Sequence, residues 1–198
     1  LLDRADGSND PLEAELYART IDDVSWFMRV LAAQLRGAPP ENALFNERDR
    51  RMGDNLAWLA EEYYAGRRII VWAATRHAVH RQKEIQYPDA PDLYADMDSM
   101  GETAHARLGD DLYTIGFTAG RGSVASVFAE EAFDIGEPKE GSVEAELDAV
   151  DHPFLFVDLR SLPDDHPLRA EQWMRPLGYG WMTANWPEQF DGLFYIDE

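Results

Sequence analysis

The sequence predicts an α/β fold: a mainly parallel β-sheet covered by helices on both faces, with an N-terminal helical hairpin or insertion. Two observations lead to this prediction. Two long amphipathic segments occupy residues 12–36 and 46–64, and beyond them short apolar runs alternate with helical segments. We therefore expect a helical region over residues 1–66 and an α/β region over residues 67–198, which together form one domain.

The first helix is predicted over residues 12–36 because apolar residues recur there at intervals of three and four. Gly37 and the prolines that follow it mark its end. The second helix is predicted over residues 46–64, with Asn46 as its N-cap. Its expected apolar face consists of Met52, Leu56, Leu59 and Tyr63.

Short apolar runs that are rich in branched and aromatic residues and bounded by Gly, Pro or Asp predict the strands. Helices are expected between them over residues 91–109 and 141–150, where apolar residues again follow a helical period. Such alternation is typical of parallel sheets, whose strands are joined by crossover helices. The predicted strands are residues 68–74, 112–119, 154–160 and 192–198.

Polar side chains follow each predicted strand, where open parallel sheets bind their ligands. His77 and His80 follow the first strand, Ser123 follows the second, and Asp158 and Asp197 end the third and fourth. A single rim is expected to gather them. His77 is the most informative, because an imidazole at a strand end can exchange a proton near neutral pH or polarise a carbonyl. The alternative is that it only hydrogen-bonds a loop.

Residue spacing points to two further kinds of site. His77, His80 and Glu84 form H-x-x-H-x-x-x-E, which on a helix would align three possible zinc ligands, although the spacing is less specific than H-E-x-x-H. The stretch "GRGSV" lacks the final glycine of G-x-S-x-G. Ser123 is therefore a poor candidate for a nucleophile, and "GFTAGRGS" reads as a tight turn.

Composition excludes several classes of function. The chain carries 18 Lys and Arg against 38 Asp and Glu, a net charge of −20 that repels nucleic acid. It lacks an apolar run of about 18 residues, so no membrane span is expected. It has no cysteine, which excludes disulfides, thiolate metal sites and a cysteine nucleophile. We expect a cytoplasmic protein without a nucleic-acid or membrane partner.

Five segments in order give the chain a family resemblance. From about Glu47 to its last residue the sequence resembles the C-terminal half of the erythromycin esterase family. The resemblance implies an α/β domain with a helical insertion and metal-independent hydrolysis, without a cofactor, of a small-molecule ester or macrolide-like substrate. The segments are "ERDRRMGDNLAWL", "IIVWAATRH", "SMGETAHARLGDDLYTIGFTAGRGS", "GSVEAELDAVDHPFLFVDLR" and "FDGLFYIDE".

The resemblance also assigns residues to a site. The family has a W-A-H-N-x-H pattern where this chain reads Trp-Ala-Ala-Thr-Arg-His, so His77 matches the second histidine and Ala74 replaces the first. His77 is the implied catalytic residue. Arg48 and Asn55 match an R-D-x-x-M-x-x-N segment and are expected to line the pocket with His80 and Ser123.

The family's main general base, a histidine in a G-E-x-x-H type segment, belongs to its N-terminal half, and these 198 residues contain no such segment. We therefore expect this chain to be the C-terminal part of a longer protein whose N-terminal half completes the site. Because alanine cannot take part in proton transfer, Ala74 favours an alternative, a non-catalytic homologue that binds a ligand in the same crevice.

Overall fold

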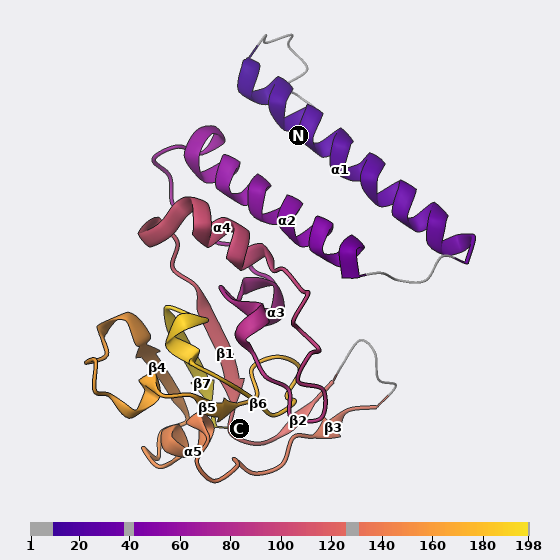
Figure 1. The fold of residues 1–198 in the computed structure, drawn as a ribbon. Helices are drawn as coiled ribbons and strands as arrows, with labels where there is room; N and C mark the ends of the chain where they lie inside the picture. The colour runs from indigo at the N-terminus through magenta and orange to yellow at the C-terminus, as the bar shows by residue number, and fades with distance from the viewer. Residues whose placement is uncertain (1–9, 38–41, 126–130, 198) are drawn as a thin grey trace.

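The computed structural model describes residues 10–37, 42–125 and 131–197. The predicted N-terminal helix is confirmed as α1 (Pro11–Leu35), which begins where Asp10 accepts a hydrogen bond from the Leu12 amide at 2.9 Å. α1 lies beside α2 (Asn42–Trp58), and the two form a hairpin that stands above the α/β part of the molecule (Figure 1). No helix in the described ranges is long and apolar enough to cross a membrane.

Much of the apolar stripe of α1 is exposed. Toward α2 the helix presents Arg19 and Asp23, which bond to Asn55 and Arg51. Polar side chains therefore contribute to the contact between these two helices, while Leu12, Leu16 and Leu31 of the stripe are half-buried. The exposed large apolar side chains of α1 are Tyr17, Ile21, Val24, Phe27, Met28 and Leu35.

α2 differs from its prediction in its start and in its buried face. Asn46 lies within the helix instead of capping it; its side-chain amide donates to the Asp96 carbonyl (2.6 Å) and its oxygen accepts from the Asp98 amide (2.9 Å). The buried face is formed by Asp49, Gly53, Ala57 and Trp58, whereas Met52 is exposed. Beyond Trp58 the helix widens into a π turn, Leu59–Tyr63.

Three of the four predicted strands form one sheet in the order β1-β7-β4. They are β1 (Ile115–Ala119), β4 (Phe154–Asp158) and β7 (Gly192–Ile196). β1 is parallel to β7, but β4 is antiparallel to it, so the prediction of a mainly parallel sheet was wrong. The reason lies in the connection from β4 to β7: it contains the antiparallel hairpin β5 (Gln172–Met174) and β6 (Met182–Ala184) in place of a crossover helix.

Residues 68–74, the fourth predicted strand, have no regular secondary structure and pair with no strand in the described structure. The segment reaches β1 through Trp72, whose ring is 5.5 Å from that of Phe117. Ile70 and Trp72 are 93% and 85% exposed. Its composition is that of a buried strand, and its surroundings do not bury it.

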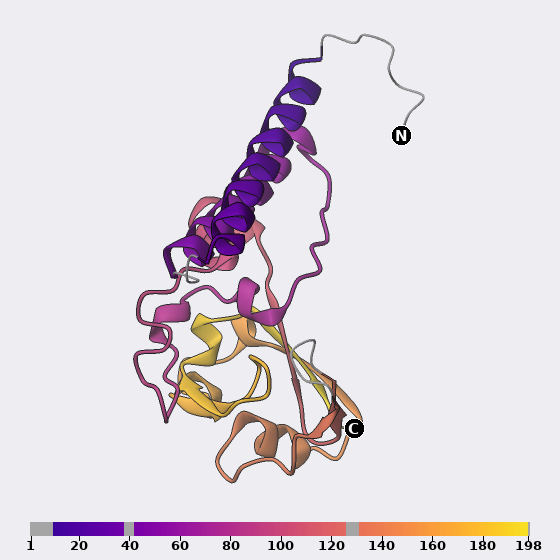
Figure 2. The same ribbon diagram turned by 90° about the vertical axis from the view of Figure 1, so that its right-hand side faces the viewer.

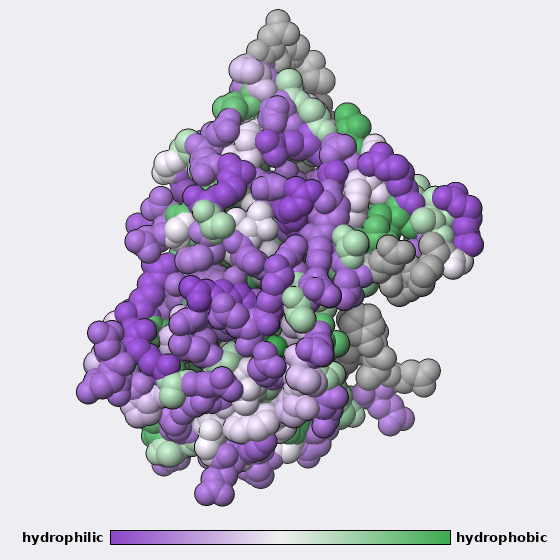
Figure 3. Space-filling model, in the orientation of Figure 1, coloured by the Kyte–Doolittle hydropathy of each residue, from purple (hydrophilic) through white to green (hydrophobic). Residues whose placement is uncertain are grey.

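The core lies on one face of the sheet. Leu193 and Tyr195 of β7 point into it and pack with Phe190, with α5 (Val143–Asp148) and with the β5–β6 hairpin. Figure 2 shows the sheet at the right-hand border of this part of the molecule, with α5 to its left. Side chains on the other face are exposed, so the prediction of cover on both faces is not met by the described residues. By contrast, the view in Figure 3 shows a mostly hydrophilic surface.

Shorter elements complete the chain. α3 (Thr75–Ala78) follows the extended segment, and α4 (Met100–Leu108) occupies only the last half of the helix predicted over 91–109, because Ser99 caps it by accepting from the Glu102 amide at 3.0 Å. β2 (Ser123–Val124) pairs antiparallel with β3 (Phe133–Asp134). The 3₁₀ turns are Gln82–Glu84, Gly109–Asp111, Leu159–Ser161, Pro167–Arg169 and Trp186–Glu188.

Candidate functional site

The candidate site is centred on a short contact between α2 and α3. The Nδ1 atom of His77 lies 2.6 Å from Oδ2 of Asp49, a carboxylate that is only 1% exposed. The other carboxylate oxygen, Oδ1, accepts a hydrogen bond from Nε of Arg48 at 2.9 Å and forms an ion pair with Nη2 of the same guanidinium at 2.8 Å. His77 is itself about one-fifth exposed, so its ring reaches solvent while its partner does not.

Two glycines allow this contact by letting the helices approach closely. A Cβ at Gly101 of α4 would lie 2.1 Å from the carbonyl oxygen of Ala78, and a Cβ at Gly53 of α2 would lie 2.5 Å from Cβ of Thr103. Any larger side chain would push α4 away from α2 and α3. Packing against α4 therefore fixes the positions of α2 and α3 relative to each other, and this places Asp49 in contact with His77.

Asp49 carries a negative charge in this contact. Burial by itself raises the pKa of the Asp49 carboxyl, yet the hydrogen bonds from His77 and Arg48 outweigh it and hold that pKa below its ordinary value. Asp49 is thus ionised at neutral pH and accepts a hydrogen bond from the Nδ1–H group of His77. The tautomer of His77 follows from this network.

The arrangement leaves one atom of His77 for chemistry. With Nδ1–H donated to Asp49, Nε2 of the neutral ring carries a lone pair and has no hydrogen-bond partner among the described residues. An imidazole oriented by a buried carboxylate is a common device for general acid–base catalysis, because the carboxylate fixes the tautomer and stabilises the imidazolium that forms. The site can accept a proton at Nε2 and return it.

Ala74 lies one turn before His77 and is exposed; its carbonyl accepts a hydrogen bond from the His77 amide at 2.9 Å. Alanine supplies no proton-transfer group at this position.

His80 does not join this site. It is buried, its Nε2 lies 2.8 Å from the hydroxyl of Thr114, and its ring stacks on that of His105 at a centroid distance of 4.1 Å. Burial, and then the neighbouring His105, lower the pKa of His80 to about 4 despite Asp191 at 3.8 Å. The neutral ring anchors the loop after α3 to the start of β1, a structural role.

The low pKa of His80 predicts a loss of stability in mild acid. The unfolded chain takes up this proton near pH 6.5, while the folded protein resists it until about pH 4. The contribution of neutral His80 to the free energy of unfolding is therefore complete above pH 6.5 and is lost as the pH falls to 4. This loss is at most about 3 kcal/mol. Urea unfolding between pH 7.5 and 4.5 should show a shallower pH dependence for His80→Gln than for wild type. The exposed His152→Gln is the control, and an unchanged slope in His80→Gln would contradict this assignment.

The possible zinc site of His77, His80 and Glu84 is not assembled. The three residues do not share a helical face, because α3 ends at Ala78 and Glu84 belongs to a separate 3₁₀ turn. Asp49 and Thr114 engage the two imidazoles separately. Over the residues that the structure describes, no group of three or more metal-ligating side chains was found.

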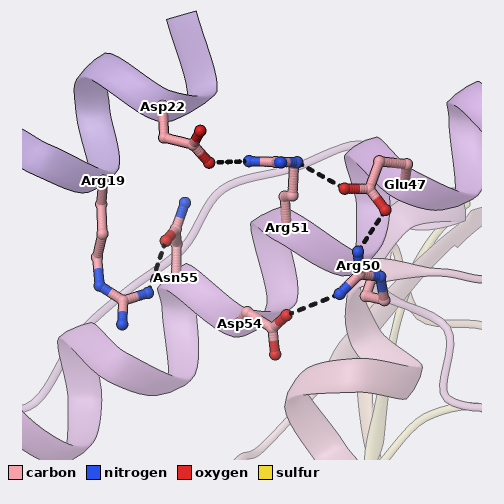
Figure 4. Close-up of a pocket in the computed structure, with 7 residues that line it drawn as sticks. All are labelled: Arg19, Asp22, Glu47, Arg50, Arg51, Asp54 and Asn55. Carbon is pink, nitrogen blue, oxygen red and sulfur yellow. Dashed lines mark hydrogen bonds and ion pairs between the residues drawn. The ribbon is translucent and has the colours of Figure 1, made fainter. Parts of the chain in front are cut away.

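Asn55 lines a cavity of about 210 Å³ between α1 and α2, and His77 is not among the residues that line it (Figure 4). Its amide oxygen accepts from Arg19 at 3.2 Å, and Arg51 beside it bridges Asp22 (2.5 Å) and Glu47 (2.8 Å). The charged groups drawn in this cavity bond to one another. These side chains therefore form a polar network that joins α1 to α2, and each exposed pair contributes little to stability.

Ser123 also lies apart from the candidate site. It belongs to β2, beyond the end of β1, whereas His80 binds Thr114 immediately before β1 begins; Figure 1 shows α3 and β2 at opposite ends of that strand. Asp158 is opposite Gly192, the first residue of β7, because β4 is antiparallel. The single rim expected from a parallel sheet was therefore wrong.

Asp49 is the residue that sequence reasoning missed. It stands among the charged residues of "NERDRRMGDN", which are usually exposed on a helix. One signal was present: Asp49, Gly53 and Ala57 are spaced by four, and a face of small residues permits close packing. A carboxylate at one end of such a face is buried, and therefore needs a partner.

The chain resembles known proteins over nearly its whole length. The sequence model of the erythromycin esterase family matches residues 2–198. "Putative hydrolase YbfO" of Bacillus subtilis is 28% identical over 193 residues, which are 92% of this chain and 37% of that protein. Erythromycin esterase type II of Escherichia coli is 28% identical over 160 residues, 76% of this chain and 36% of that one. The chain thus spans little more than a third of either relative.

Solved structures share the fold. A crystal structure of a succinoglycan biosynthesis protein superposes with a TM-score of 0.63 at 21% identity, covering 80% of this chain and 40% of that one. A Bacillus cereus protein superposes with a TM-score of 0.59 at 18% identity, covering 81% and 40%. At these identities the likeness concerns the fold alone.

Proposed function

Because the chain belongs to the erythromycin esterase family, we propose that it takes part in the hydrolysis of an ester by water, with His77 as a proton-transfer group. The observation that supports this role is the 2.6 Å contact between Nδ1 of His77 and the buried carboxylate of Asp49. That contact favours proton transfer over the other role considered for this imidazole, the polarisation of a substrate carbonyl. Asp49 is then the positioning residue, and Arg48 holds Asp49.

In the proposed reaction, Nε2 of His77 takes a proton from the attacking water as the C–O bond to the carbonyl carbon forms. The tetrahedral intermediate then expels the alcohol oxygen, which receives that proton from the imidazolium. Asp49 stabilises the imidazolium between these steps. The products are a carboxylic acid and an alcohol, and no cofactor is consumed.

We further propose that residues outside this chain complete the site, since the chain spans 37% of the Bacillus relative. They would supply the groups that bind the carbonyl oxygen and a second base. Arg48, which is partly exposed beside Asp49, is proposed to line the pocket from this side. A net charge of −20 attracts a cationic substrate, as a macrolide with an amino sugar would be.

A second candidate function, binding without chemistry, is favoured by Ala74. In that case the crevice holds a ligand and His77 contributes a hydrogen bond only.

The test is acid release, measured by pH-stat, from a panel of macrolide lactones and simple aryl esters, with the family-length polypeptide that contains these residues. Hydrolysis that is first-order in protein supports the esterase. Saturable binding of a panel member by calorimetry, without acid release, would instead support the binder.

A further inference from the structure

One face of the sheet, with the segment beside it, forms a continuous apolar surface that we call the open sheet face. The strand register places Phe117, Phe194 and Phe156 in a row across β1, β7 and β4. The Phe117 and Phe194 rings are 5.6 Å apart, and Trp72 extends the row at 5.5 Å from Phe117. The remaining exposed members are Ile70, Ile115 and Phe154.

At the edge of this surface, residues 68–74 pair with no strand among the described residues. Ile70 and Trp72 of this segment are 93% and 85% exposed, and they are the two most exposed of the large apolar side chains that the structure describes. An exposed apolar edge with unpaired backbone amides is a template for strand addition.

The exposed apolar area is as large as the largest patch of a typical monomer. A half-exposed aromatic side chain leaves on the order of 100 Å² accessible. Trp72, Phe117, Phe154, Phe156 and Ile70 therefore expose about 500 Å² together, within the range of about 300–600 Å² in which such patches are often functional. Such a surface is typical of an interface.

Two observations identify what covers it. More than half the length of each relative lies outside the part that this chain matches. In addition, Arg67 and Arg68, at the start of the edge segment, have no ion pair among the described residues, in a chain with 38 acidic residues. The cover is thus expected to be polypeptide that carries carboxylates of its own.

We propose that the open sheet face is the docking surface for the remaining polypeptide of a family-length protein. That polypeptide adds a strand beside residues 69–73, covers the aromatic row and pairs carboxylates with Arg67 and Arg68. The edge segment runs directly into α3, so docking also fixes the backbone that presents His77. The inference rests on the surface and on family membership, and it stands whether or not the site hydrolyses esters.

Amide hydrogen exchange tests this without an activity assay. It is measured on residues 69–73 in the 198-residue chain and in the family-length polypeptide that contains it. We expect these amides to exchange at least a hundredfold more slowly in the longer protein, because a docked strand hydrogen-bonds and buries them. Ile70→Asp should reduce that protection at least tenfold, while Val150→Asp, at a 57% exposed site beyond α5, should leave it unchanged.

Three results would overturn the proposal. Rapid exchange of these amides in both proteins would show that nothing covers the edge. Protection that increases with the concentration of the 198-residue chain alone would show that a second copy covers it. A gene that encodes only these 198 residues would remove the proposed occupant.

Discussion

Replacing His77 with alanine is expected to lower kcat for ester hydrolysis by at least a hundredfold, the usual contribution of general acid–base catalysis being about 10² to 10⁴. The substitution removes the atom, Nε2, that takes the proton of the attacking water. KM should change much less, because a small proton-transfer group contributes little to ground-state binding. Initial rates on the best ester of the panel, with the family-length polypeptide, give both constants.

Folding must be separated from chemistry in this variant. Removing His77 leaves the buried Asp49 with Arg48 as its hydrogen-bond partner, so circular dichroism and a urea titration should accompany the kinetics. His152→Ala, at an exposed histidine, is the matched control and should keep full activity. Undiminished kcat in a folded His77→Ala protein would remove His77 from the mechanism.

Replacing Gly101 with alanine is expected to destabilise the protein by about 3 kcal/mol or more. The new Cβ would lie 2.1 Å from the Ala78 carbonyl oxygen and 2.6 Å from that of Val79, and these are backbone atoms that cannot rotate away. α4 must then separate from α3, which also disturbs the contact between His77 and Asp49. Urea unfolding of the 198-residue chain measures the loss.

The control for Gly101→Ala is Ala106→Gly, an exposed position in the same helix. It reports helix propensity alone and should cost about 1 kcal/mol. By propensity alone Gly101→Ala would stabilise α4, so a neutral or stabilising result would mean that the close approach of α3 and α4 does not exist in solution.

Local patterns in the sequence predicted local structure well. The three- and four-residue spacing over 12–36 predicted α1, and three apolar runs marked β1, β4 and β7. The direction of each strand could not be predicted in this way, because an apolar run has the same pattern in both directions. β4 is antiparallel because of its connection to β7. For the same reason, the prediction that the polar residues after each strand share one rim was wrong, since some of them lie at opposite ends of β1.

The segment 68–74 shows a different limit. Its composition is typical of a buried strand, yet the described residues supply no strand to pair with it. The proposed docking of further polypeptide on the open sheet face would account for this difference. The candidate site was half predicted: His77 followed from its place after this run, whereas Asp49 required the tertiary packing of α2 on α3 through Gly53 and Gly101.

The central claim is that Asp49 acts through His77, and a double-mutant cycle on kcat tests it most directly. We predict that Asp49→Asn lowers kcat because asparagine no longer fixes the His77 tautomer, and that the variant with both Asp49→Asn and His77→Ala is no slower than His77→Ala alone. Two losses that multiply in the double variant would contradict the claim, since each residue would then act independently.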